Sequence, residues 1–194
     1  MAELAPVDNG VVDIRAASTR LGEDPELLAK VLQVYKPHCR YLKSASVSVR
    51  NGRCVARGEF AIDIPCYIDD TGHFNAVEFN ICYNQLAYFA VAKVVKEQAL
   101  PAFEGWGMDD FWERQLPSIL ITAFRAIFRS QIDSDAFHGE ITFATFARST
   151  IREPVLFIDS TTRYWDESGG RADGETKLAI LDPPREDATA EPQA

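Results

Sequence analysis

One carboxylate stands out in the most apolar part of the chain. Glu78 lies one helical turn from both Asn75 and Cys82, in a segment (75–100) whose side chains are almost all apolar until the final lysines. A carboxylate in such a segment is costly unless it is paired or protonated, so we expect Glu78 to transfer protons from an amine or a water molecule. The alternative is a structural carboxylate that bonds a loop N–H group or an arginine.

Asn75 stands where the helix should begin, after a loop that contains Gly72. A helix start presents unpaired backbone N–H groups and about half a positive charge. A carbonyl group docked there gains negative charge on its oxygen when a nucleophile attacks its carbon, and also when a nucleophile attacks the β-carbon of an α,β-unsaturated carbonyl compound. One electrostatic device could therefore serve hydrolysis and addition, and each donor would contribute about 3 kcal/mol.

Four further side chains each have a functional and a structural interpretation. Tyr67 could donate its phenol to the substrate, or could be a half-buried aromatic at a strand end. His73, in the loop before the helix, could shuttle protons or face solvent. Asn84 projects from the helix side opposite Asn75, so both can act only if the site borders two subunits or if one is structural. Cys82, on a buried helix, is more typical of a small apolar residue than of a nucleophile.

The elements that must position these residues follow from apolar periodicity. Asp24 and Pro25 start a short amphipathic helix that ends by Pro37, and Asn51-Gly52 joins the strands of a hairpin. The long apolar segment predicts a helix that is buried nearly all round. A second, shorter helix is expected at 109–115, and the remaining strands at 119–129, 140–148, 155–165 and 176–181. Six strands curled around one buried helix form an α+β domain with a hotdog layout.

Length and composition bound the rest. The chain has 194 residues, 46% hydrophobic and 25% charged, which fits a single domain at 23–182 with a flexible N-terminal arm at 1–22 and a disordered tail at 183–194. The net charge of −9 argues against a nucleic-acid partner. Four scattered cysteines are expected to be reduced thiols, and the longest apolar stretch is too short to cross a membrane. These features predict a soluble, cytoplasmic protein.

The stretch CYIDDTGHFNAVEFNICYNQLAYFAVAKVV, residues 66–95, closely resembles the FcoT-like type III fatty acyl thioesterase family, and VLQVYKPHCRYLKSASV, residues 31–47, resembles its N-terminal part. The resemblance covers roughly residues 25–180 and implies a hotdog fold. It implies site roles for Tyr67, Asn75 and Asn84, and less directly for Tyr35 and Tyr88. The two tyrosines could equally be core residues with satisfied hydroxyls.

Several members of this family are similar to the (2E)-enoyl-carrier-protein glycyltransferases of isonitrile-lipopeptide and β-amino-acid pathways. Those enzymes add glycine to the β-carbon of an α,β-unsaturated fatty acyl thioester and release a 3-(carboxymethylamino) fatty acid. The resemblance implies the same activity here, with glycine and an acyl thioester on carrier protein or coenzyme A as partners. It implies no metal and no organic cofactor. An arginine should bind the glycine carboxylate, and the candidates on predicted elements are Arg40, Arg125, Arg129 and Arg148.

Two other functions stay open. A plain long-chain fatty acyl-CoA thioesterase needs the same oxyanion site but no glycine pocket. A non-catalytic hotdog protein that binds acyl chains or carrier proteins would need neither Glu78 nor Asn75. By analogy with the fold, a homodimer or higher homo-oligomer with sites near its interface is expected, and no membrane partner.

Overall fold

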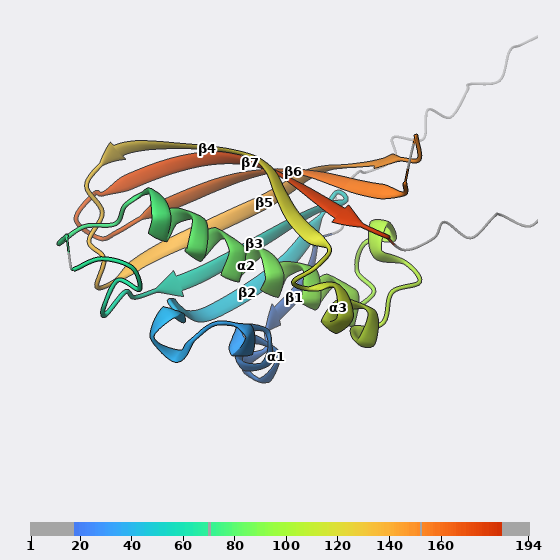
Figure 1. Ribbon diagram of the computed structural model, residues 1–194, viewed down its shortest axis with the longest axis horizontal. Coiled ribbons are helices and arrows are strands. Elements are labelled where there is room, and N and C mark those ends of the chain that lie inside the picture. The colour runs from blue at the N-terminus through green and yellow to red at the C-terminus, as the bar shows by residue number, and fades with distance from the viewer. Residues whose placement is uncertain (1–17, 70, 152, 184–194) are drawn as a thin grey trace, which may run out of the picture.

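The computed structural model describes residues 18–69, 71–151 and 153–183. A seven-stranded antiparallel sheet curls around one long helix, α2 (Ala76–Lys96) (Figure 1). The helical elements besides α2 are α1 (Pro25–Val31), η1 (Leu32–Val34), η2 (Pro37–Cys39), η3 (Pro101–Phe103) and α3 (Met108–Arg114). The strands are β1 (Ser18–Glu23), β2 (Leu42–Arg50), β3 (Arg53–Phe60), β4 (Ile119–Ser130), β5 (Phe137–Ser149), β6 (Val155–Trp165) and β7 (Arg171–Leu181). This is the predicted α+β hotdog layout.

The sheet runs in the order β1-β2-β3-β5-β6-β7-β4. The strand that follows α2 in the chain is therefore placed at one end of the sheet, and β1 at the other. We expected six strands and a flexible arm at residues 1–22, and both predictions were wrong at Ser18–Glu23. These residues form a seventh strand, β1, which pairs with β2 from Ser18↔Arg50 to Glu23↔Ser46. The remainder of the predicted arm and the predicted tail beyond residue 183 lie outside the described residues.

The long helix is buried against the concave face of the sheet. Fifteen of its residues from Glu78 to Val95 are buried, and it begins at Asn75 as predicted. Two glycines let aromatic rings approach closely beneath its first turns. A Cβ at Gly139 would lie 2.6 Å from the Tyr164 ring, and one at Gly174 would lie 2.6 Å from the Phe79 ring. The N-terminal half of α2 thus packs against the sheet through closely spaced aromatic rings.

Two strand boundaries differ from the prediction, and glycine explains both. The strand expected at 140–148 begins earlier, at Phe137, and includes Gly139, whose missing side chain makes room for Tyr164. The strand β7 begins at Arg171, five residues before the predicted start. Gly170 leaves just enough room for the backbone of Gln131 and Ile132, so the chain enters the sheet directly after it.

The short helix α1 is anchored to the end of α2. Asp24 caps α1 by accepting the Leu27 N–H at 3.1 Å, and its other carboxylate oxygen binds Lys93 at 3.3 Å and Lys96 at 2.6 Å. Lys93 is therefore buried but paired. No helix in the described part of the chain is both long and apolar enough to cross a membrane.

Candidate active site

The start of α2 holds three of the predicted site residues together. The Asn75 N–H donates to Glu78 Oε2 at 3.0 Å, while Asn75 Oδ1 accepts the Val77 N–H at 2.9 Å. This reciprocal arrangement is a capping box, which satisfies backbone donors at the helix start. The Tyr67 hydroxyl donates to the same Asn75 Oδ1 at 2.8 Å. The side chains of Tyr67, Asn75 and Glu78 therefore form one connected group.

Glu78 serves the helix with only one of its two oxygens. The side chain is 1% exposed, and its Oε1 atom has no hydrogen-bond partner among the described residues. Leaving a buried polar oxygen without a partner costs roughly 1–3 kcal/mol, so such atoms are uncommon unless a ligand or water meets them. The bond at Oε2 thus fits the structural interpretation of Glu78, and proton transfer at Oε1 stays a prediction.

The helix start offers fewer free N–H groups than expected. Asn75 Oδ1 takes the Val77 N–H, and the capping box extends to the N–H of Glu78. A docked carbonyl therefore cannot rely on a full set of backbone donors, although the helix dipole still favours negative charge there. The Tyr67 side chain is 46% exposed, and its hydroxyl becomes a donor to a docked carbonyl when its one proton turns away from Asn75 Oδ1.

A chain of hydrogen bonds from the middle of α2 positions the Tyr67 loop. Gln85 is fully buried, and its Oε1 accepts the N–H groups of Tyr41 at 3.0 Å and Leu42 at 2.9 Å. The Tyr41 hydroxyl then accepts the N–H of Cys66 at 2.9 Å, one residue before Tyr67. The sequence analysis did not predict this connection. The signal for it was Gln85 itself, a polar amide in the most apolar part of the helix.

Tyr35 and Tyr88 form a second group further along the helix. Burial raises the pKa of the Tyr35 phenol, with added contributions from the nearby Tyr88 and Cys82 side chains. Burial also raises the pKa of the Cys82 thiol well above its ordinary value, and the Glu78 carboxylate adds to this increase. A thiol held in its neutral form is a poor nucleophile. Cys82 thus lies between the Glu78 group and the tyrosine pair as an apolar spacer.

Asn84 and His73 lie apart from the Tyr67, Asn75 and Glu78 group. Asn84 donates to Asn80 at 3.4 Å on the half-exposed side of α2, as its position opposite Asn75 on the helix predicts. His73 is exposed, and its Nδ1 lies 2.9 Å from the Thr71 carbonyl oxygen. It lines a concavity of about 420 Å³ with Phe74, Asn75, Ala76 and the end of β4. His73 is therefore at the mouth of the site rather than inside it.

Residues 30–180 match the sequence model of the FcoT-like thioesterase domain. The chain belongs to the FcoT-like thioesterase family. Among its curated relatives, a (2E)-enoyl-ACP glycyltransferase of Streptomyces coeruleorubidus is 48% identical, and the match covers 83% of this chain and 99% of that protein. Proteins with the same name from Mycobacterium marinum (36% identical; 87% and 91% covered) and Mycobacterium bovis (38%; 82% and 87%) are also similar.

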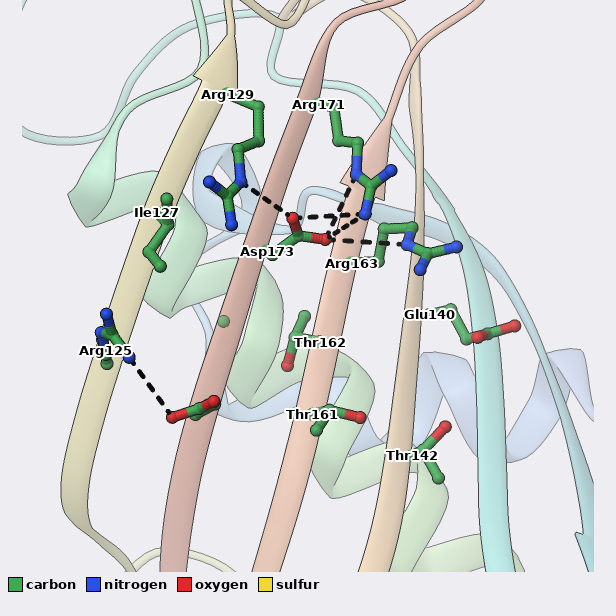
Figure 2. Close-up of a pocket in the computed structure, with 12 residues that line it drawn as sticks. Arg125, Ile127, Arg129, Glu140, Thr142, Thr161, Thr162, Arg163, Arg171 and Asp173 are labelled. Atoms are coloured by element: carbon green, nitrogen blue, oxygen red, sulfur yellow. Dashed lines mark hydrogen bonds and ion pairs between the residues drawn. The ribbon is translucent and has the colours of Figure 1, made fainter.

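The four candidate arginines of this FcoT-like chain divide between two faces. Arg40 donates from Nε to the Tyr35 carbonyl oxygen at 3.1 Å, and no carboxylate pairs with it among the described residues. Arg148 binds the Ala102 carbonyl at 3.1 Å. Arg125 and Arg129 lie on the sheet face away from α2, where they line a second concavity of about 410 Å³ (Figure 2). Arg40 is thus the one bonded to a candidate site residue.

The described part of this FcoT-like chain contains no cluster of three or more His, Cys, Asp or Glu side chains that could hold a metal ion. All four cysteines are free thiols, as predicted. The group at the start of α2 supplies a carboxylate, a phenol, an amide and a helix dipole. Together these groups can accept a proton and stabilise negative charge on a carbonyl oxygen.

Proposed function

We propose that this protein adds glycine to the β-carbon of an α,β-unsaturated fatty acyl thioester held on an acyl carrier protein. The thioester is then hydrolysed to release a 3-(carboxymethylamino) fatty acid. The names of the relatives support the substrate class. The observation that carries the chemistry is the buried, unpartnered Oε1 of Glu78, bonded through its other oxygen to the group that contains Tyr67.

In the addition step, Glu78 takes a proton from the glycine ammonium group and so frees the nitrogen lone pair. The nitrogen forms a bond to the β-carbon, and the electrons of the carbon–carbon double bond move toward the thioester oxygen as an enolate. The Tyr67 hydroxyl, turned from Asn75 Oδ1 toward this oxygen, and the dipole of α2 stabilise that negative charge. Glu78 then returns its proton to the α-carbon, which leaves the carboxylate ready for a second cycle.

In the release step, Glu78 takes a proton from water, and the hydroxide attacks the thioester carbonyl. The oxyanion occupies the position that the enolate oxygen held, so the same groups stabilise it. Collapse of the tetrahedral intermediate breaks the carbon–sulfur bond, and the carrier thiol leaves with the proton. One arrangement of Tyr67, Asn75 and Glu78 thus serves two chemically different attacks.

Arg40 is our candidate for binding the glycine carboxylate. Its guanidinium is bonded to the backbone of Tyr35, next to the tyrosine pair, and has no described carboxylate partner. Arg125 and Arg129 are each engaged with an acidic side chain, at 3.9 Å to Glu175 and 3.3 Å to Asp173. A guanidinium with free N–H groups can bind a carboxylate through two parallel hydrogen bonds.

The protein is further proposed to be a homodimer or a higher homo-oligomer. The strand β4 ends the sheet order and pairs only with β7 among the described strands. Along it, Leu120, Phe124 and Phe128 are 37–42% exposed, and Val77 on α2 is 44% exposed. A long edge strand with apolar side chains is prone to association unless another chain covers it. Light scattering on the purified protein tests this proposal.

The test of the activity is mass spectrometry of the purified protein with a medium-chain trans-2-enoyl thioester, with and without glycine. A released acid heavier by one glycine, formed only when glycine is present, supports the proposal. Release of the free enoic acid at equal rates in both samples points to a plain acyl thioesterase, which the family name also fits. Binding of the acyl thioester without turnover points to the non-catalytic protein.

A further inference from the structure

The outer face of the sheet carries a concentrated group of arginines. Asp173 on β7 is surrounded by three guanidinium groups, which come from β4, β6 and β7 (Figure 2). Its carboxylate lies 3.3 Å from Arg129 Nε, 3.0 Å from Arg171 Nη2 and 3.7 Å from Arg163 Nε. Three cations around one anion leave an excess of two positive charges. The same concavity contains one more arginine and two glutamates, so the excess over the whole concavity is one positive charge, in a chain whose net charge is −9.

These arginines are accessible to a partner. The side chains of Arg129, Arg163 and Arg171 are 57%, 56% and 48% exposed, whereas that of Asp173 is 26% exposed. Each guanidinium has five N–H donors. Among the described residues, Arg163 makes no hydrogen bond, and Arg129 donates only from its Nε atom, to Asp173. Most of the donors in this arginine cluster (Arg129, Arg163, Arg171) are therefore unused.

The arginine cluster adjoins the mouth of the candidate site. Arg129 lines both the outer concavity and the concavity at the start of α2 that contains Asn75 and His73. The loop before α2 is bonded to the end of β4, because Phe74 N–H donates to Ile132 O at 3.1 Å and Gln131 Nε2 to Gly72 O at 3.3 Å. A molecule bound at the cluster therefore lies next to the end of β4, where the concavity that contains Asn75 begins.

We propose that the arginine cluster is the docking surface for an acidic acyl carrier protein, which presents its thioester to the site past the end of β4 at residues 129–131. This inference rests on the proposed function. An acidic partner approaching a protein of net charge −9 needs a local surface of opposite charge, and the cluster supplies one beside the mouth. Spaced carboxylates on a carrier helix suit exposed guanidinium groups that have unused donors.

The test compares two substrates that carry the same trans-2-decenoyl group. One is bound to a bacterial acyl carrier protein of fatty acid synthesis, and the other to N-acetylcysteamine, which has neither a protein nor a phosphate. Arg163→Glu should raise the KM for the carrier-bound substrate at least about tenfold, while kcat/KM for the small thioester stays within about twofold. Arg171→Gln should give a smaller effect with the same pattern.

Arg53→Glu is the matched control, since Arg53 is an exposed arginine at the hairpin end of β3 that lines neither concavity. The docking proposal is overturned if Arg163→Glu and Arg53→Glu have equal KM values for the carrier-bound substrate. It is also overturned if Arg163→Glu impairs only a coenzyme A thioester, since the cluster would then bind nucleotide phosphates.

The docking proposal can also be tested apart from the proposed function. If the parent protein forms no glycine adduct with the small thioester, the proposed function fails, and the docking is then measured directly. Fluorescence anisotropy of a labelled carrier protein at low salt should show binding to the parent and a Kd at least about tenfold higher for Arg163→Glu. Equal binding of both proteins overturns the docking surface whatever the activity.

Discussion

The substitution Glu78→Gln separates the helix-capping role of the Glu78 side chain from the proton transfer that we propose for it. The Gln carbonyl can still accept the Asn75 N–H, which now donates to Glu78 Oε2 at 3.0 Å. Replacing a charged acceptor by a neutral one at a helix start costs about 1–2 kcal/mol. Against this, the substitution replaces a buried carboxylate oxygen without a described partner by an amide NH2 group, which costs less to bury than a carboxylate. The free energy of unfolding should therefore change by no more than about 2 kcal/mol.

Turnover should respond very differently, because an amide cannot accept the proton from glycine or water. Loss of a general base lowers rates by about 10²–10⁴-fold. The assay is glycine adduct formation followed by mass spectrometry, alongside urea unfolding of the same preparation. Asp110→Asn is the matched control. Asp110 makes the equivalent capping contact on α3, accepting the Gly107 N–H at 2.9 Å, but it lies outside the candidate site.

A folded Glu78→Gln protein that keeps its turnover within about threefold of the parent would refute the catalytic role, and Glu78 would then be a helix cap alone. A loss of turnover in Asp110→Asn of similar size would also refute it, because any weakened cap would then suffice to explain the defect. The expected pattern is a large kinetic effect at Glu78 and none at Asp110, with modest changes in stability at both.

Three further outcomes are expected. Tyr67→Phe removes the donor to Asn75 at 2.8 Å and should lower kcat about 10²-fold, with an unchanged Tm, since the side chain is half exposed. Gln85→Leu leaves two buried backbone N–H groups without an acceptor and should lower the free energy of unfolding by about 2–4 kcal/mol, as measured by urea titration. Asp24→Asn keeps the helix cap but removes its charge. The hydrogen bond from Lys96 holds the pKa of Asp24 below its ordinary value of 3.8, so the stabilisation is present above that value and is lost as the pH falls through the folded pKa. The Tm difference between parent and Asp24→Asn should be largest at neutral pH and shrink below about pH 4 in calorimetry.

The sequence correctly predicted the features that depend on residues close together in the chain, such as helix caps and tight turns. The capping position of Asn75 and the positive φ angles of Asn51 and Gly52, +52° and +70°, are set by nearby residues, and the structure has both as expected. Gly139 was misplaced because a glycine can mark either a turn or a close contact. Only the packing of Tyr164 from the neighbouring strand decides between them. The first strand was missed because its short, polar sequence becomes a strand only by pairing with β2.

The candidate site divides in the same way. The group at the start of α2 was predictable, since Asn75 and Glu78 are three residues apart on one helix. The link from Gln85 through Tyr41 to the loop of Tyr67 joins residues 44 and 25 positions apart, and no periodicity connects them. The arginine cluster brings three strands together around Asp173, so it depends on a sheet order in which β4 and β6 both flank β7.

The two oxygens of Glu78 have a consequence for how substitution data on this chain should be interpreted. A library scored by protein abundance would find that most replacements of Glu78 disturb the cap of α2, and would classify the position with ordinary folding determinants. The catalytic role that we propose for its buried Oε1 atom would then go unnoticed. The library would reveal that role only if each variant were scored both for protein abundance and for product formation. The informative comparison is then between the Glu78→Gln variant and the parent protein.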